Sequence, residues 1–123
     1  MHDPEQMNDM KTKSETFQYG SKIEPIVPGP GLKRQVLGYD GQLMAVKVSF
    51  EKGTVGTQHA YYHSQVTYIV SGKFELCIGG KTAVLGAGDG YYVAPDELHG
   101  CTCLEDGVLI DTFSPMRADF LEP

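Results

Sequence analysis

Hydrophobic residues in the middle of this chain recur at every second position. The clearest example is the run 42–50, whose apolar residues all fall on one face: Met44, Val46, Val48 and Phe50. Successive side chains of a β-strand point to opposite faces of the sheet, so strict alternation indicates a strand with one buried face. We therefore predict a half-buried strand over these residues.

Six further strands are predicted after this one, at 66–70, 74–78, 82–85, 91–94, 99–103 and 108–113. Gly79-Gly80 predicts a two-residue hairpin turn, and turns are also expected at 71–73 and 104–107. The segment 26–31 is expected to be an irregular arm, and 117–121 a short helical turn. About eight strands without a convincing helix are typical of an all-β sandwich or barrel.

The length of 123 residues favours a single domain, and a hydrophobic content of 41% is enough for one core. Residues 1–17 are polar and show no period, so we expect an N-terminal tail there. The predicted barrel then covers residues 18–123.

Charge and cysteine content narrow the class of partner. The net charge of −6 argues against nucleic acid or an anionic membrane, although one buried arginine could still bind a small anion. No apolar run approaches the roughly 20 residues that span a bilayer. Three cysteines, an odd number, and the lack of a signal peptide favour a reducing cytoplasm over a secreted disulfide scaffold.

Three of the four histidines lie in two segments, 59–65 and 88–99. His59, Gln65 and His99 together offer imidazole nitrogens and an amide oxygen, which suit a borderline divalent metal. His63 shares strand parity with His59 if the strand is unbroken, so it could be a further ligand or a hydrogen-bond partner of one.

Two cysteines share parity with His99. Cys101 and Cys103 could complete a zinc cluster with it, but buried free cysteine commonly packs as a small hydrophobe, and packing is the favoured interpretation.

Asp111 lies between Leu109 and Phe113 on one face of the last predicted strand. If that face is buried, an apolar setting would raise the pKa of the carboxyl group, as a general acid or base requires. The alternative places Val108 and Ile110 inside and Asp111 outside. Because both faces are apolar, the outer one is expected to pack against a second subunit.

The glycines and polar residues of the two histidine segments recur at fixed spacings: Gly53, His59, Gln65 and Gly72, then Gly88, Ala94, Asp96 and His99. They resemble the paired motifs of the cupin superfamily, G-x5-H-x-H-x3-E/Q-x6-G and G-x5-P-x-G-x2-H. Ala94 stands in place of the proline and Asp96 in place of the glycine. The resemblance implies a single-domain double-stranded β-helix, or jelly roll, holding one divalent transition metal (Ni, Fe, Mn or Zn).

One departure affects the metal. Tyr61 stands where the first motif has its second histidine, and a phenol is a poor ligand near neutral pH. The metal could keep three protein ligands, recruit His63 or be lost.

The C-terminal segment 107–121 and the segment 63–72 resemble the KdgF family of pectin-degradation cupins. That resemblance implies metal-dependent ring opening and ketonisation of 4,5-unsaturated uronate sugars. With the cysteine content and the two apolar faces of the last strand, we expect a cytoplasmic homodimer that acts on such a sugar acid. The resemblance also implies that Asp111 moves a proton, that Arg117 holds the carboxylate of the sugar acid, and that Phe113 forms an apolar wall. The alternatives are a non-catalytic cupin that binds a small molecule such as a sugar, and a metal-dependent oxygenase.

Overall fold

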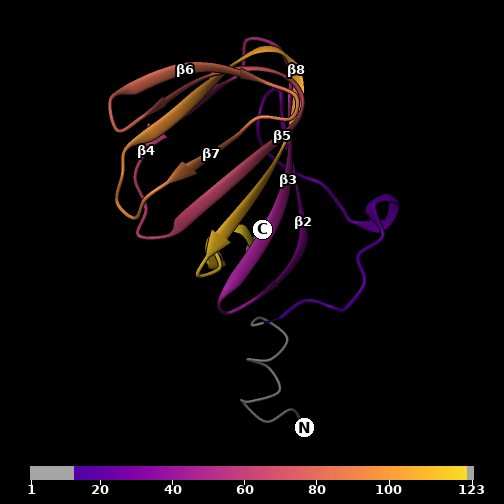
Figure 1. The fold of residues 1–123 in the computed structure, drawn as a ribbon. Coiled ribbons are helices and arrows are strands. Elements are labelled where there is room, and N and C mark those ends of the chain that lie inside the picture. The colour runs from indigo at the N-terminus through magenta and orange to yellow at the C-terminus, as the bar shows by residue number, and fades with distance from the viewer. Residues whose placement is uncertain (1–12, 122–123) are drawn as a thin grey trace, which may run out of the picture.

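The computed structural model describes residues 13–121, so most of the predicted tail, residues 1–12, lies outside the described part of the chain (Figure 1). Its strands are β1 (Ile26–Gly29), β2 (Leu32–Asp40), β3 (Leu43–Phe50), β4 (Val55–His59), β5 (Ser64–Ile78), β6 (Lys81–Gly86), β7 (Gly90–Val93) and β8 (His99–Ser114). Two 3₁₀ turns, η1 (Gly20–Lys22) and η2 (Ala118–Leu121), complete the described elements. All strand pairs are antiparallel.

Two long strands, β5 and β8, run through both layers of the fold (Figure 1). The first half of β5 pairs with β7 and the second half with β6. The second half of β8 pairs with β3, while its first half pairs with β4. The paired long strands therefore link one layer, containing β2, β3 and β7, to another containing β4 and β6. This all-β arrangement is the predicted jelly roll.

Two predicted turns prove to be bends within continuous strands. Residues 71–73 lie inside β5 and residues 104–107 lie inside β8, where the β5–β8 register shifts. Gly72 has φ +85°, and a Cβ added to it would lie 2.5 Å from the Cα of Gly107. Glycines allow both this backbone conformation and this close approach, and they commonly mark bulges. The turn-like residues thus bend the long strands from one layer into the other.

The hairpin formed by β1 and β2, and strand β4, were not predicted. Residues 26–29 form β1 instead of an irregular arm. Strand β4 contains Gly56, Thr57 and Gln58 and therefore lacks a hydrophobic pattern; its extended form follows from pairing with β8. The Gly79-Gly80 hairpin turn is confirmed, with φ of +55° and +81° at the two glycines.

Two clusters of buried side chains form the core. One contains Met44, Val46, Val48, Phe113 and Phe120, and the other contains Ile69, Phe74, Leu76, Cys103 and Leu109. The predicted inward face of 42–50 is confirmed by the first three of these residues. Phe50 packs against both clusters and meets Phe74 edge to face, with ring centroids 5.2 Å apart. Within residues 13–121, no helix is long and apolar enough to cross a membrane.

Candidate functional site

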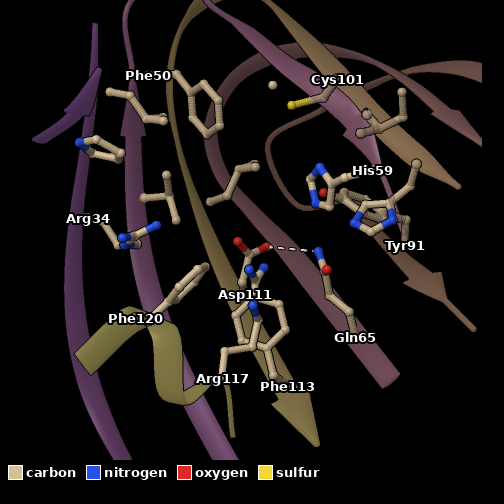
Figure 2. Close-up of a pocket in the computed structure, with 18 of the residues that line it drawn as sticks. Arg34, Phe50, His59, Gln65, Tyr91, Cys101, Asp111, Phe113, Arg117 and Phe120 are labelled. Atoms are coloured by element: carbon tan, nitrogen blue, oxygen red, sulfur yellow. Dashed lines mark hydrogen bonds between the residues drawn. The ribbon is translucent and has the colours of Figure 1, made fainter. Parts of the chain in front are cut away.

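A cavity of about 150 Å³ opens between the two layers of the barrel. Six of the seven predicted catalytic and metal-ligand residues line it: His59, Gln65, His99, Asp111, Phe113 and Arg117 (Figure 2). They come from β4, β5, β8 and the segment before η2. Since pockets for drug-sized ligands usually measure about 300–1,000 Å³, this cavity suits a smaller molecule.

His59 and His99 face each other across the β4–β8 pair, where they are register partners with ring centroids 4.3 Å apart. Nδ1 of His59 lies 2.7 Å from the carbonyl oxygen of Thr57, and Nδ1 of His99 lies 3.0 Å from that of Glu97. A carbonyl only accepts hydrogen bonds, so each Nδ1 carries the proton and each Nε2 keeps its lone pair. Burial also lowers the pKa of His59, which favours the neutral ring.

Gln65 is held by a hydrogen-bond network that orients its amide group. Its Nε2 donates to Thr67 Oγ1 at 2.9 Å and to Asp111 Oδ1 at 3.3 Å. Thr67 in turn donates its hydroxyl proton to Asp111 Oδ1 at 2.6 Å. Because the amide nitrogen is engaged by two acceptors, the amide oxygen of Gln65 is left available for another partner.

These orientations fit a divalent metal. Two free imidazole nitrogens and one free amide oxygen form a mixed nitrogen and oxygen donor set. Each imidazole is also anchored through its other nitrogen, as metal-ligating histidines usually are. The described residues contain no group of three or more His, Cys, Asp and Glu side chains suited to a metal. The donor set proposed here differs from such a group because its third member is the amide oxygen of Gln65.

Tyr61 contacts the site without extending the set of histidines. Its ring lies 4.8 Å from that of His59 and 3.6 Å from the guanidinium carbon of Arg117. The tyrosine therefore links the predicted metal ligand His59 to the arginine side of the cavity.

The structure does not bring His63 to the other predicted ligands. Strand β4 ends at His59 and β5 begins at Ser64, so the assumed strand parity does not hold. His63 is buried, stacks on Tyr62, and places Nε2 3.1 Å from the carbonyl oxygen of Met116. It does not line the cavity.

Asp111 faces inward, at the register position opposite Val46 and Thr67. Burial raises the pKa of this carboxyl group to about 6, although the hydrogen bond from Thr67 and the positive charge of Arg117 act in the opposite direction. A carboxyl group with this pKa can both accept and release a proton near neutral pH. Oδ1 accepts the two bonds from the network, which leaves Oδ2 for a ligand.

Arg117 is buried and held from several sides. Its Nε and Nη2 donate to the two carboxylate oxygens of Asp119 at 3.3 and 2.8 Å, which is a bidentate ion pair. Its guanidinium carbon also lies 4.1 Å from the ring centroid of Phe120. Tyr61 and Phe120 thus stack on the guanidinium group while Asp119 binds its edge.

Sequence reasoning missed Arg34 and Tyr91, which also line the cavity (Figure 2). Burial raises the pKa of Tyr91 well above its usual range, so its phenol stays protonated and can donate a hydrogen bond. Arg34 lies on β2, which carried no clear strand pattern. Because neither that strand nor its register could be predicted, nothing in the sequence indicated that the Arg34 side chain points into the cavity.

The two cysteines near His99 have different environments. Cys103 is buried in the core, with Sγ 3.0 Å from the carbonyl oxygen of Glu105, so it packs as expected. Cys101 lines the cavity, and burial raises its pKa to about 11, which keeps the thiol protonated.

Residues 46–112 match the family described as "Cupin domain". The chain is also 47% identical to the pectin degradation protein KdgF of Dickeya dadantii (strain 3937) over 95 residues, covering 76% of this chain and 86% of that protein.

Two solved structures are similar throughout. An RmlC-like cupin from Shewanella frigidimarina has a TM-score of 0.87 and 50% identity, covering 89% of this chain and 98% of the other. KdgF from Halomonas sp. has a TM-score of 0.83 and 35% identity, covering 87% of this chain and 99% of the other.

Proposed function

The chain belongs to the cupin family, and we propose that it promotes ring opening and ketonisation of 4,5-unsaturated uronate sugars released in pectin or alginate breakdown. The observation that carries the proposal is Asp111, a carboxyl group with a pKa of about 6 beside the candidate metal ligands. The identity to KdgF, a pectin degradation protein, supports this substrate class.

His59, Gln65 and His99 would hold one divalent transition metal through two Nε2 atoms and an amide oxygen. A bound divalent metal supplies Lewis-acid polarisation of a sugar oxygen. The reaction itself is an isomerisation: a proton leaves the anomeric hydroxyl, the bond between C1 and the ring oxygen breaks, and C4 gains a proton. The enol thereby becomes a linear keto acid without any oxidant or reductant.

Asp111 is placed to carry that proton. Thr67 and Gln65 fix one of its oxygens, so the other can exchange a proton with the sugar in a defined direction. Phe113, on the same strand, contributes an apolar wall to the cavity. The positive charges of Arg34 and Arg117, which both line the cavity, attract the carboxylate of the sugar acid.

The test is the loss of enol absorbance of a 4,5-unsaturated monouronate with metal-reconstituted protein. We expect acceleration over the uncatalysed rate, and a poorer rate with a neutral analogue lacking the carboxylate. A wild-type rate equal to the uncatalysed rate would reject the enzymatic function.

One observation favours a second function, a non-catalytic cupin that binds a small sugar. Tyr61 replaces a histidine of the first motif, which reduces the ligand set. Binding of a sugar acid without turnover of the unsaturated monouronate would select this alternative.

We also propose that the protein is a homodimer. Val66, Tyr68 and Val70 on β5, and Tyr92 on β7, expose apolar side chains on the outer face. Val66 and Tyr92 are register partners, so the exposed residues form one surface. Such surfaces mark interaction sites, and sedimentation equilibrium should give twice the monomer mass, whereas Tyr68→Lys should give the monomer.

A further inference from the structure

We propose that Arg34, and not Arg117, is the residue that binds the carboxylate of the substrate. The proposal rests on the proposed function for the identity of the substrate. It concerns a residue outside the two histidine segments and the C-terminal segment that carry the family resemblance.

One of the two hydrogen-bonding edges of the Arg117 guanidinium, the one formed by Nε and Nη2, is already occupied. Its Nε and Nη2 form the bidentate pair with Asp119, which is the geometry that a bound carboxylate would also use. This is the only ion pair formed among residues 13–121. An incoming carboxylate would therefore have to displace Asp119 to bind Arg117 through the same edge.

Arg34, in contrast to Arg117, has no carboxylate partner among the described residues. It lines the cavity, forms no ion pair within the described residues, and its Nε is buried without a hydrogen-bond partner. Leaving a buried charged donor unsatisfied is costly, so such a group usually has a partner. A bound carboxylate would supply both the missing acceptor and the missing negative charge.

The position of Arg34 is also fixed before any ligand arrives. Its guanidinium carbon lies 3.8 Å from the ring centroid of Phe120, the ring that Arg117 contacts at 4.1 Å. Stacking on an aromatic ring orients the guanidinium plane and reduces the conformational entropy lost on binding. Arg117, held by Asp119 and Tyr61, in turn supports Phe120 and acts as a positioning residue.

The arrangement across the cavity suits the reaction. Figure 2 shows Arg34 and His59 on opposite sides, with Asp111 between them. A sugar acid bound through its carboxylate at Arg34, with its anomeric end toward the histidines, would place the reacting ring atoms near Asp111.

The decisive experiment measures binding of galacturonate, a saturated uronate that cannot react, and of its neutral methyl ester to metal-reconstituted protein by calorimetry. We expect Arg34→Gln to weaken galacturonate binding by about 10- to 100-fold, the scale of a hydrogen bond to a charged group, and to leave ester binding unchanged. Lys33→Gln is the matched control, because it removes the same charge from an exposed neighbour on β2, and it should bind as the wild type.

Arg34→Lys keeps the charge but loses the planar fork and should give intermediate affinity, which also covers a failure of Arg34→Gln to fold. In Arg34→Gln, the second change Asp119→Asn frees the edge of Arg117 and should restore part of the galacturonate binding. Wild-type affinity in Arg34→Gln, or a wild type that binds acid and ester equally, would overturn the proposal. So would a larger, acid-specific loss in Arg117→Gln.

Turnover separates this proposal from the proposed function. With the unsaturated monouronate, Arg34→Gln should raise KM about 10- to 100-fold and change kcat by less than about threefold. If the wild type shows no turnover but Arg34→Gln still loses galacturonate selectively, the function fails and the role of Arg34 stands. If the wild type turns over and Arg34→Gln keeps its KM, the role of Arg34 fails and the function stands.

Discussion

The two sides of the cavity treat their polar groups differently. On the histidine side, His59, His99 and Gln65 each use one polar atom within the protein and keep another free for a ligand. On the arginine side, Nε and Nη2 of Arg117 bind Asp119, while Nε of Arg34 has no partner. The first side is prepared for a cation and the second for an anion.

The difference shows how one small cavity can orient a molecule with two unlike ends. Opposite charge preferences at its two sides would allow only one productive orientation of the proposed sugar acid. Asp111 lies between them and is hydrogen-bonded to the histidine side through Gln65.

Removing one imidazole should abolish the cation preference of the histidine side. We expect His99→Ala to weaken metal binding by more than about 100-fold, because even residues that only support a ligand contribute about 10- to 100-fold. Metal analysis after reconstitution and dialysis measures the effect. Cys101→Ala, two residues along β8, should retain the metal, since the predicted ligands are His59, Gln65 and His99; loss of metal there would contradict the ligand assignment.

Neutralising Asp111, which lies between the two sides, should stop the reaction without preventing ligand binding. Asp111→Asn preserves the shape of the side chain but cannot carry the proton, so we expect the rate to fall by roughly 100-fold or more. Galacturonate affinity, measured on the same sample, should change little. An Asp111→Asn variant with full activity would rule out the proposed role of this carboxyl group.

The same carboxyl group should make the metal-free fold depend on pH. Its pKa rises from 3.8 to about 6 in the folded protein, so folding favours the protonated form. The stabilisation is complete below about pH 4 and is lost as pH rises through 6. The difference of about 2 pH units corresponds to about 3 kcal/mol.

Urea unfolding of metal-free protein between pH 4 and 8 tests this dependence. Relative to Asp111→Asn, the free energy of unfolding of the wild type should decrease with rising pH. A constant difference between the two proteins would show that burial does not penalise the charge.

Restoring the histidine of the motif should increase metal affinity on the histidine side and weaken the support of Arg117 on the other side. Tyr61→His adds an imidazole beside His59, and we expect metal affinity to increase by about tenfold, the smallest of these effects. It also replaces the phenol ring that contacts the guanidinium group of Arg117 with a smaller imidazole. Tyr61→Phe, which keeps that ring, is the control; a drop in metal affinity in Tyr61→Phe would identify the phenol as a ligand.

Local patterns in the sequence determined much of the fold and the histidine side of the site. Alternation is a property of consecutive residues, so Met44, Val46 and Val48 could be assigned to the core from the sequence. Two short segments contain His59, Gln65 and His99 at the spacing of the family motifs, and the structure brings all three to one cavity. The inward direction of Asp111 was left open by an apolar strand and is decided by its register with Val46 and Thr67.

Only the tertiary structure decided the rest, because it depends on contacts between residues far apart in the chain. The sequences around Gly72 and Gly107 are typical of turns, and only the close packing of β5 against β8 shows that they are bends within continuous strands. His63 shares a segment with the ligands, but the break before β5 sends it elsewhere. Arg34 and Arg117 look equivalent as sequence letters; which one is free to bind an anion depends on where Asp119 and Phe120 lie in space.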